Sequence, residues 1–299
     1  MMRTYNIKLS LKIVLVCLIF FYGLGVGRYE WFPFSVINKT KNLFKYQSIV
    51  KFDNFGRLIY SSNHKEISCP IRNEKLGVIV SFGQSNSANY AERLYKPNEL
   101  KNVINYFDGR CYIAQSPLLG ADGAKGEWIS LTANNLVEKG IYNKVIIVSS
   151  GIGGTSIKRW AKGNDLNKMF IEVISSLSKK YIITDIIWHQ GESDKQTHGK
   201  VYKFYFETLV ESIRNSKINA PIFISIASNC GEEKNWNYPN EISEAQLELT
   251  QIDGVEFGLN TDQKIPFSLR YDKCHFGKLG QKIAADELAT SISKYHKFK

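Results

Sequence analysis

The chain has 299 residues, of which 43% are hydrophobic and 22% charged, a composition typical of a globular protein with one large α/β domain or two small ones. No repeat, low-complexity tract or proline-rich linker divides it. The net charge of +11 would attract acidic polymers, but the basic residues form no Lys/Arg-rich block, so we do not expect nucleic acid to be a partner.

The start of the chain differs from the rest. Arg3, Lys8 and Lys12 precede an apolar run over residues 13–21, which continues less uniformly to Gly27. Basic residues before an apolar run are typical of a secretory signal or a signal anchor, with the basic end left in the cytoplasm. We expect residues 1–30 to anchor the chain in a membrane as a single helix, with the remainder periplasmic or extracellular. Secretion after cleavage behind Gly27 is the alternative.

The apolar run is short for a membrane-spanning helix, at about 15 residues against the ~17–25 that a span needs. Leucines before Lys12, and aromatic residues from Tyr29 to Phe34 after the run, would complete the span as interfacial anchors. A buried core helix is disfavoured because no face of the run is polar.

Five cysteines are present. Cys17 lies in the apolar run, which leaves Cys69, Cys111, Cys230 and Cys274 in the body of the chain. These four can form disulfides in an exported protein, and the sequence does not choose among the three possible pairings. No cysteine or histidine cluster has the spacing of a metal site, so we expect no structural zinc.

Residues 31–75 are mixed and polar, with a strand-like piece at residues 57–60, and we expect them to form a membrane-proximal extension. Short apolar, β-branched runs then recur along the chain. They cover residues 76–80, 144–148, 182–188, 221–226 and, more weakly, 255–259. Segments with helical spacing alternate with them, at residues 131–137, 170–177, 202–213 and 279–295. Apolar strands that alternate with amphipathic helices predict a parallel sheet covered on both faces, here in one domain over residues 76–299.

Polar, glycine-containing segments follow three of the predicted strands, and a fourth precedes the last helix. They cover residues 81–87, 151–157, 188–194 and 271–277. The carboxyl ends of parallel strands meet at one edge of a sheet, where ligands bind. We therefore expect these four segments to converge on one site.

The residues of these segments carry a resemblance to a known family. The motifs are Gly83-Gln84-Ser85-Asn86, Gly153-Gly154-Thr155 with Trp160 behind it, Gln190-Gly191-Glu192, and Asp272-x-x-His275. They resemble, in order, the four blocks of the SGNH hydrolases, and more narrowly those of the sialate O-acetylesterase and acetylxylan esterase branch. The resemblance spans about residues 76–295. It implies a three-layer α/β/α sandwich with a flavodoxin-like parallel sheet, and a serine esterase that needs no cofactor.

The chemistry of these residue types agrees with the resemblance. Ser85 is the candidate nucleophile, His275 the base that takes its proton, and Asp272 the acid that orients the imidazole. The resemblance implies an oxyanion hole made of the backbone N–H groups of Ser85 and Gly153 and the side-chain amide of Gln190.

Each assignment has a structural alternative. Ser85 could be a helix cap, Gln190 could be a buried polar residue that satisfies loop backbone, and Gly154 competes with Gly153 as the oxyanion donor. Possible substrate contacts are Gln84, Asn86, Gly154, Glu192 and Trp160. We expect Glu192 and Asp194 to have structural or substrate-positioning roles and His189 a structural one. Trp160 and Trp128 could form the floor of a sugar site or belong to the core.

The resemblance implies that the chain hydrolyses O-acetyl esters on sialic acid or another acetylated surface glycan. The basic surface would suit an acidic glycan. Two alternatives stay open from the sequence: a polysaccharide O-acetyltransferase on the same fold, and an inactive, anchored glycan-binding module. The sequence does not identify the sugar or the acetylated hydroxyl.

Overall fold

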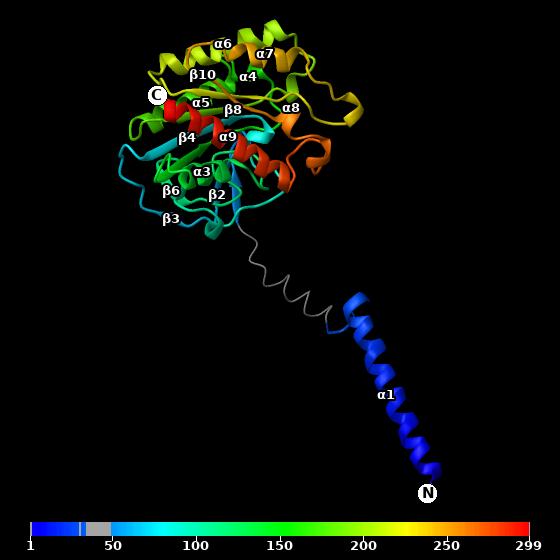
Figure 1. The fold of residues 1–299 in the computed structure, drawn as a ribbon. Coiled ribbons are helices and arrows are strands. Elements are labelled where there is room, and N and C mark those ends of the chain that lie inside the picture. Colours follow the sequence, from blue (N-terminus) through cyan, green and yellow to red (C-terminus); the bar gives the residue numbers. More distant parts are fainter. Residues whose placement is uncertain (1, 30, 34–48, 299) are drawn as a thin grey trace. The chain divides into compact units, whose positions relative to one another are not determined.

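The computed structural model describes residues 2–29, 31–33 and 49–298 (Figure 1). The chain forms two compact units, Met1–Ser48 and Ile49–Lys299. In the first unit, helix α1 spans Met2–Tyr29, and its described side chains between Val14 and Leu24 are mostly exposed and apolar. Among the residues that the structure describes, no helix has both the length and the apolar character that crossing a membrane requires. The side chains of Arg3, Lys8 and Lys12, and all of Phe34, lie outside the described residues.

The second unit is built on an eight-stranded sheet with the order β10-β9-β8-β4-β7-β5-β6-β3. Five strands match the predicted apolar runs: β4 (Leu76–Gly83), β7 (Lys144–Ser149), β8 (Asp185–His189), β9 (Ile222–Ile226) and β10 (Val255–Asn260). All five are parallel, and β4 lies between β7 and β8. In chain order these five have the spatial arrangement 2-1-3-4-5, so the predicted flavodoxin-like parallel sheet is confirmed.

The sheet continues beyond β7 with three strands that the sequence did not predict. They are β5 (Val103–Phe107), parallel to β7, followed by β6 (Arg110–Ile113) and β3 (Glu66–Ile67), which are antiparallel. These strands are short and contain polar residues, so they lack an uninterrupted apolar run. The sheet is therefore mixed at one edge rather than parallel throughout.

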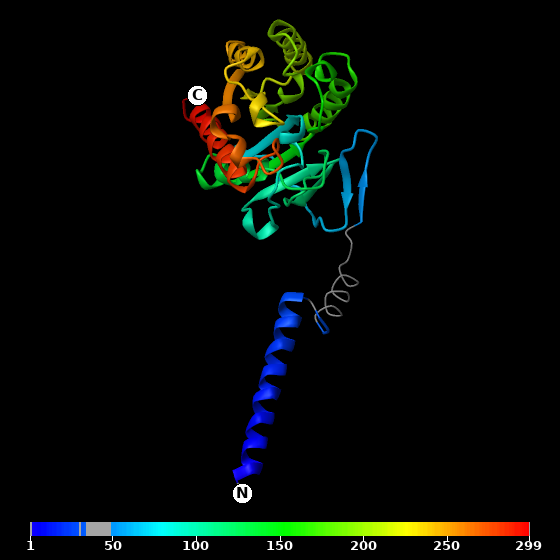
Figure 2. The same cartoon turned by 90° about the vertical axis from the view of Figure 1, so that its right-hand side faces the viewer.

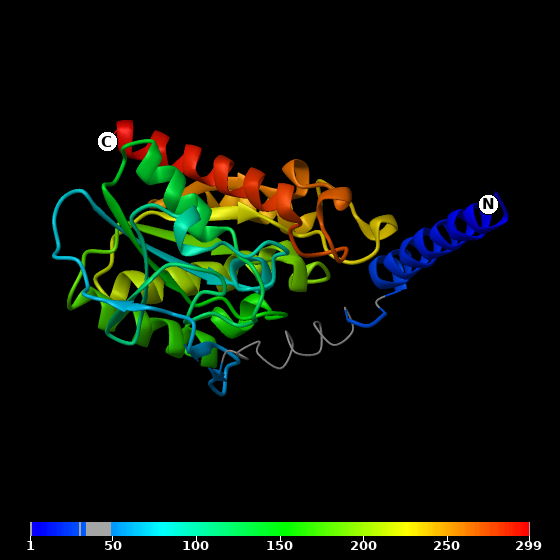
Figure 3. The same ribbon diagram turned by 90° about the horizontal axis from the view of Figure 1, so that it is seen from below.

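Helices cover both faces of the sheet. On one face lie α3 (Ile129–Glu138) and α9 (Lys278–Phe298), and on the other lie α4 (Ile157–Trp160), α5 (Asp165–Ser178), α6 (Gly199–Asn215) and α7 (Glu241–Leu249). A short helix, α8 (Thr261–Lys264), follows β10. Figure 3 shows α9 running across one face, with α5 and α6 on the opposite side. Alternate residues of β4 serve the two layers: Val80 and Phe82 pack against α5 and α6, whereas Ile79 packs toward α3 and α9. The three-layer α/β/α sandwich is confirmed.

The compact unit begins at Ile49, within the segment expected to be a membrane-proximal extension. Strands β1 (Val50–Phe52) and β2 (Leu58–Ser61) form an antiparallel hairpin at the side of the sandwich (Figure 2). Strand β3 then pairs with β6, and a disulfide between Cys69 and Cys111 joins the same two segments. The other disulfide joins Cys230 to Cys274, so the structure selects one of the three pairings that the sequence left open.

Candidate active site

Ser85 lies directly beyond the carboxyl end of the central strand. It begins a single 3₁₀ turn, Ser85–Ser87, and is 95% buried. Gly83, two residues earlier, has a φ of +128°, and a Cβ there would lie 2.1 Å from the His189 carbonyl oxygen. Only glycine fits so close an approach at that φ. Gly83 therefore lets β4 run tightly along β8 and still direct the chain into the turn that carries Ser85.

Asp272 and His275 lie in the loop before α9 and form the predicted pair. The His275 Nδ1 atom is 2.7 Å from Asp272 Oδ2, and Asp272 Oδ1 accepts the backbone N–H of His275 at 2.8 Å. Burial alone would raise the pKa of Asp272, but these hydrogen bonds from His275 lower it. Asp272 is therefore held as a carboxylate that fixes the orientation of the imidazole.

Asn86 brings the Asp272–His275 loop to the serine. Its Nδ2 atom donates to the carbonyl oxygen of Cys274 at 3.3 Å, and its Oδ1 atom accepts the N–H of Phe276 at 3.3 Å. The residue after Ser85 thus binds the residues on both sides of His275. No hydrogen bond joins the Ser85 hydroxyl to the His275 ring among the described residues, and the catalytic contact often tightens only with substrate bound.

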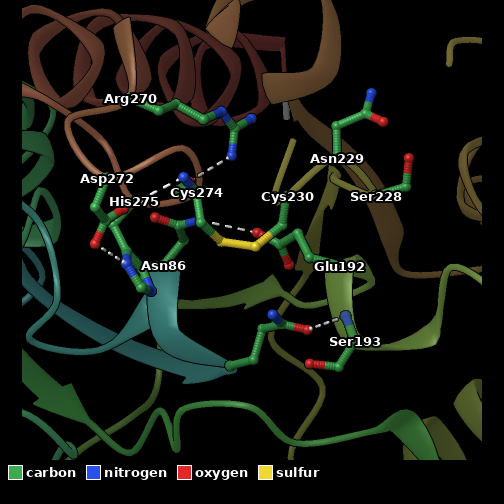
Figure 4. The surroundings of a disulfide bond; sticks show 12 residues. Asn86, Glu192, Ser193, Ser228, Asn229, Cys230, Arg270, Asp272, Cys274 and His275 are labelled. Atoms are coloured by element: carbon green, nitrogen blue, oxygen red, sulfur yellow. Dashed lines mark hydrogen bonds and ion pairs between the residues drawn. A yellow bond between two sulfur atoms is a disulfide. The ribbon is translucent and has the colours of Figure 1, made fainter. Parts of the chain in front are cut away.

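Glu192 belongs to the same buried network (Figure 4). Its Oε1 atom accepts from Asn86 at 2.9 Å and lies 3.1 Å from Nε2 of His189. Burial alone would raise the pKa of Glu192, but His189, Asn86 and the nearby Arg270 guanidinium lower it to about 2. Arg270 itself donates to the Cys274 carbonyl oxygen at 2.8 Å. Asn86 and Glu192, predicted as possible substrate contacts, are both buried. In this structure their hydrogen bonds join the serine turn to the loop after β8 and to the loop before α9.

The disulfide between Cys230 and Cys274 adds a covalent tie to this loop (Figure 4). Cys230 lies in the segment after β9, and the backbone N–H of the next residue, Gly231, donates to the Lys273 carbonyl oxygen at 3.0 Å. The loop between Asp272 and His275 is therefore fastened both to the β9 segment and, through Asn86, to the serine turn.

Gly153 follows β7 and carries the predicted oxyanion donor. Its backbone N–H donates to Asp122 Oδ2 at 3.0 Å, and the Tyr90 hydroxyl donates to the same oxygen at 2.7 Å. The ring of Tyr90 also stacks on His275, with centroids 5.2 Å apart. Among the hydrogen bonds of the described residues, none uses the N–H of Ser85. A carboxylate oxygen thus lies where an anionic oxygen would be bound by Gly153.

The motifs of the sequence include neither Asp122 nor Tyr90. Asp122 lies in a Gly-Ala-Asp-Gly turn over residues 120–123, whose glycines are the sole local signal. The turn is brought to the site by long-range backbone contacts, such as the N–H of Asp122 donating to the Gly151 carbonyl oxygen at 2.9 Å.

Gln190 follows β8 and is fully buried. Its amide nitrogen donates to the carbonyl oxygen of Thr155 at 3.0 Å and to Gln84 Oε1 at 3.2 Å, and it also contacts Asp194. The Gly153 N–H and the Gln190 amide, which the family resemblance directs at an oxyanion, thus both donate to protein acceptors. This geometry matches the structural alternative named for Gln190.

The remaining predicted substrate contacts divide into buried and exposed positions. Gln84 is 98% buried, and its Oε1 atom also accepts backbone N–H groups of the loop after β8. Trp160 is fully buried, packs against Phe82 and donates to Thr155 at 3.0 Å, so it offers no face to a sugar. The prediction of Trp160 as a sugar contact is therefore wrong. Gly154 is exposed, with a φ of +66° and open space beside it.

Comparison with known proteins gives the family. A family model described as carbohydrate esterase, sialic acid-specific acetylesterase, matches residues 75–294. No curated protein matches the chain significantly. A solved protein from Arabidopsis thaliana is 18% identical with a TM-score of 0.60, over 74% of this chain and 98% of its own.

Two further solved structures have similar folds. NanS is 15% identical with a TM-score of 0.58, over 77% of this chain and 100% of its own. A carbohydrate acetylesterase from Xanthomonas citri is 14% identical with a TM-score of 0.53, over 75% of this chain and 57% of its own. At these identities the likeness establishes the α/β fold. The match to the family model covers most of the chain and establishes the family. The chain belongs to the carbohydrate esterase family of sialic acid-specific acetylesterases and is a carboxylic ester hydrolase.

Proposed function

We propose that Ser85, His275 and Asp272 form the catalytic triad with which this esterase removes O-acetyl groups from a carbohydrate. The observation that carries the proposal is the attachment of the His275–Asp272 pair to the serine turn through Asn86, which binds the residues on both sides of His275. The comparisons give no support to a transferase or an inactive binding module.

In the proposed reaction the Ser85 oxygen attacks the acetyl carbonyl carbon while Nε2 of His275 takes the hydroxyl proton. The tetrahedral intermediate collapses, the C–O bond to the sugar breaks, and the sugar oxygen receives the proton from His275. Water then attacks the acetyl-serine while His275 takes a proton from it, the bond between the acetyl carbon and the Ser85 oxygen breaks, and that oxygen receives the proton from His275 as acetate leaves. Asp272 stabilises the imidazolium in both steps because its carboxylate accepts a hydrogen bond from the Nδ1–H group and stays ionised.

The oxyanion of each intermediate needs donors that are already in place. We assign this role to the backbone N–H groups of Ser85 and Gly153, and we assign Gln190 to holding the loops after β7 and β8. The acetyl carbonyl oxygen must displace Asp122 Oδ2 from the Gly153 N–H, where it lies at 3.0 Å. We keep the exposed Gly154 as a possible contact of the sugar, because the space beside it is open.

The proposed substrate is an O-acetylated sialic acid or another acetylated surface glycan, since the family is described by that sugar. The test is acetate release from O-acetylated sialic acid, acetylated xylan and 4-nitrophenyl acetate by the wild type and by Ser85→Ala. We expect turnover by the wild type and its loss in the variant. Comparable turnover by a folded Ser85→Ala protein would refute the triad.

We propose further that α1 attaches the enzyme to a membrane, with the esterase unit periplasmic or extracellular. Exposed apolar side chains between Val14 and Leu24 support this, as do two disulfides, which persist in oxidising compartments. Full-length protein should fractionate with membranes, and deletion of residues 1–30 should release it. Recovery of the full-length protein wholly in the soluble fraction would contradict the attachment.

A further inference from the structure

A cavity of about 860 Å³ lies beside the candidate active site and contains no triad residue. Its walls come from the β1–β2 hairpin, the end of β5 and one side of α5. We call it the outer cavity. Its lining includes Phe55, Arg57, Phe107, Asp108, Lys168 and Glu172. Its volume lies within the range of pockets that hold small ligands, roughly 300–1,000 Å³.

The outer cavity is joined to the site by two adjacent backbone segments. Gly120 and Ser150 line the cavity, and the segments that follow them lead to Asp122 and to Gly153. The two segments run together, because the Asp122 N–H donates to the Gly151 carbonyl oxygen at 2.9 Å. Three residues of extended chain cover at most about 10 Å. Ser150, which lines the cavity, therefore lies within about 10 Å of Gly153.

The hairpin forms a wall common to both places. Arg57 lines the cavity and forms a β-bridge with Asp122, whose carboxylate lies at Gly153. The hairpin therefore borders both the cavity and the turn that carries Asp122 to Gly153.

The lining has the chemistry of a site for an uncharged sugar. Phe55 and Phe107 supply partly exposed aromatic surface, and four carboxylates face two cations around the cavity. Asp53 is paired with Arg57 at 2.7 Å, whereas Asp108, Lys168 and Glu172 form no ion pair within the described residues. Carboxylates accept hydrogen bonds from sugar hydroxyls and repel the carboxylate of an acidic sugar.

We propose that the outer cavity binds a neutral sugar unit next to the acetylated one, and that the enzyme thereby selects acetylated oligosaccharides over single acetylated sugars. This inference rests on the proposed function of Ser85. The cavity would then prefer a neutral sugar even though the net positive charge of the whole chain attracts acidic polymers.

The test places a bulky side chain in the cavity by a substitution at an exposed position on α5. Ser176 lines it from α5, and Ser178, exposed two residues further along the same helix, does not. Ser176→Trp should lower kcat/KM for acetylated xylotetraose about tenfold, which corresponds to the loss of one good contact. Ser178→Trp is the matched control and should leave it unchanged. Asn tolerates the positive φ of 48° at position 108. Asp108→Asn should lower kcat/KM for acetylated xylotetraose a few-fold, because one charged hydrogen-bond acceptor is lost.

Turnover of 4-nitrophenyl acetate separates this inference from the proposed function. It should be the same in the wild type and in both tryptophan variants, and absent in Ser85→Ala. The outer-cavity proposal is overturned if Ser176→Trp matches Ser178→Trp on acetylated xylotetraose, if the wild type treats acetylated xylose and xylotetraose alike, or if it prefers acetylated oligogalacturonate. If Ser85→Ala still cleaves 4-nitrophenyl acetate, the proposed function fails instead.

Discussion

Cys274 is bonded to Cys230, so the residue immediately before His275 is covalently attached to the segment after β9. The second disulfide, between Cys69 and Cys111, lies at the far edge of the sheet and contacts none of the triad. The two bonds enclose nearly equal lengths of chain, with sequence separations of 44 and 42. By the chain-entropy relation each should stabilise the fold by about 4 kcal/mol.

We predict that removing the two disulfides has equal effects on stability and unequal effects on catalysis. Cys230→Ala with Cys274→Ala should lower kcat about 10²-fold, because a shift of ~1 Å in His275 is enough for such a loss. Cys69→Ala with Cys111→Ala should leave kcat unchanged. Unfolding curves and kcat for 4-nitrophenyl acetate check both variants at a temperature where each is folded. Equal kcat values would show that the bond near His275 does not position it.

The triad residues should act as one unit. Ser85→Ala and His275→Ala should each abolish nearly all turnover, and the double variant should be little worse than either. Asp272→Asn should cost about 10⁴ in kcat, as in serine proteases, because the amide favours the wrong imidazole tautomer. If the losses in activation free energy of the two single variants add in the double variant, Ser85 and His275 do not act together.

Asp122 should act against the oxyanion. Its carboxylate competes for the Gly153 N–H, and its charge opposes the negative oxygen that forms there. We therefore expect Asp122→Asn to raise kcat/KM for 4-nitrophenyl acetate about tenfold, a change of about 1.4 kcal/mol in the barrier. Tyr90→Phe removes the other hydrogen bond to Asp122 Oδ2 and should change the rate much less. A lower kcat/KM in Asp122→Asn would mean that the carboxylate orients Gly153.

Glu192 should make stability depend on pH in the acid range. Its pKa falls from an ordinary value of 4.5 to about 2 in the folded protein, so its stabilising effect is complete above pH 4.5 and is lost as the pH falls through about 2. That shift corresponds to about 3 kcal/mol. The difference in unfolding free energy between the wild type and Glu192→Gln should be largest above pH 4.5 and shrink toward pH 2.

Denaturant unfolding between pH 2 and 6 measures this difference. Glu207→Gln, the same chemical change at an exposed position on α6, serves as the matched control. A constant gap between Glu192→Gln and the wild type would show that the carboxylate contributes through packing or hydrogen bonding alone.

Much of the fold could be predicted because β4, β7, β8 and β9 are almost wholly buried and read as apolar runs, whereas the partly exposed edge strand β10 gives a weaker one. Strands β3, β5 and β6 could not, because a short strand with polar residues has no period that a single sequence reveals. The antiparallel edge arises from contacts such as Glu66 with Tyr112, and such long-range contacts leave no local pattern.

For the site, the sequence could predict which segments converge, since all follow strands of one sheet or precede α9. It could not predict which way a polar side chain points. Asn86, Glu192 and Gln84 lie in the expected motifs, but they turn inward and bind loop backbone and one another. Asp122 reaches Gly153 from a turn that carries no recognisable motif. The pairing of Cys230 with Cys274 likewise depends on where two distant loops meet.

The contact between Asn86 and Cys274 also has a consequence for biosynthesis. The two residues are 188 positions apart, so the chain carries its serine long before it carries the base. At ~5–20 residues per second, the ribosome needs roughly 10–40 s to make the intervening segment. Throughout that interval the nascent chain has the proposed nucleophile without its proposed proton acceptor. By the proposed mechanism, esterase activity begins only after nearly the whole polypeptide, including His275, has been synthesised.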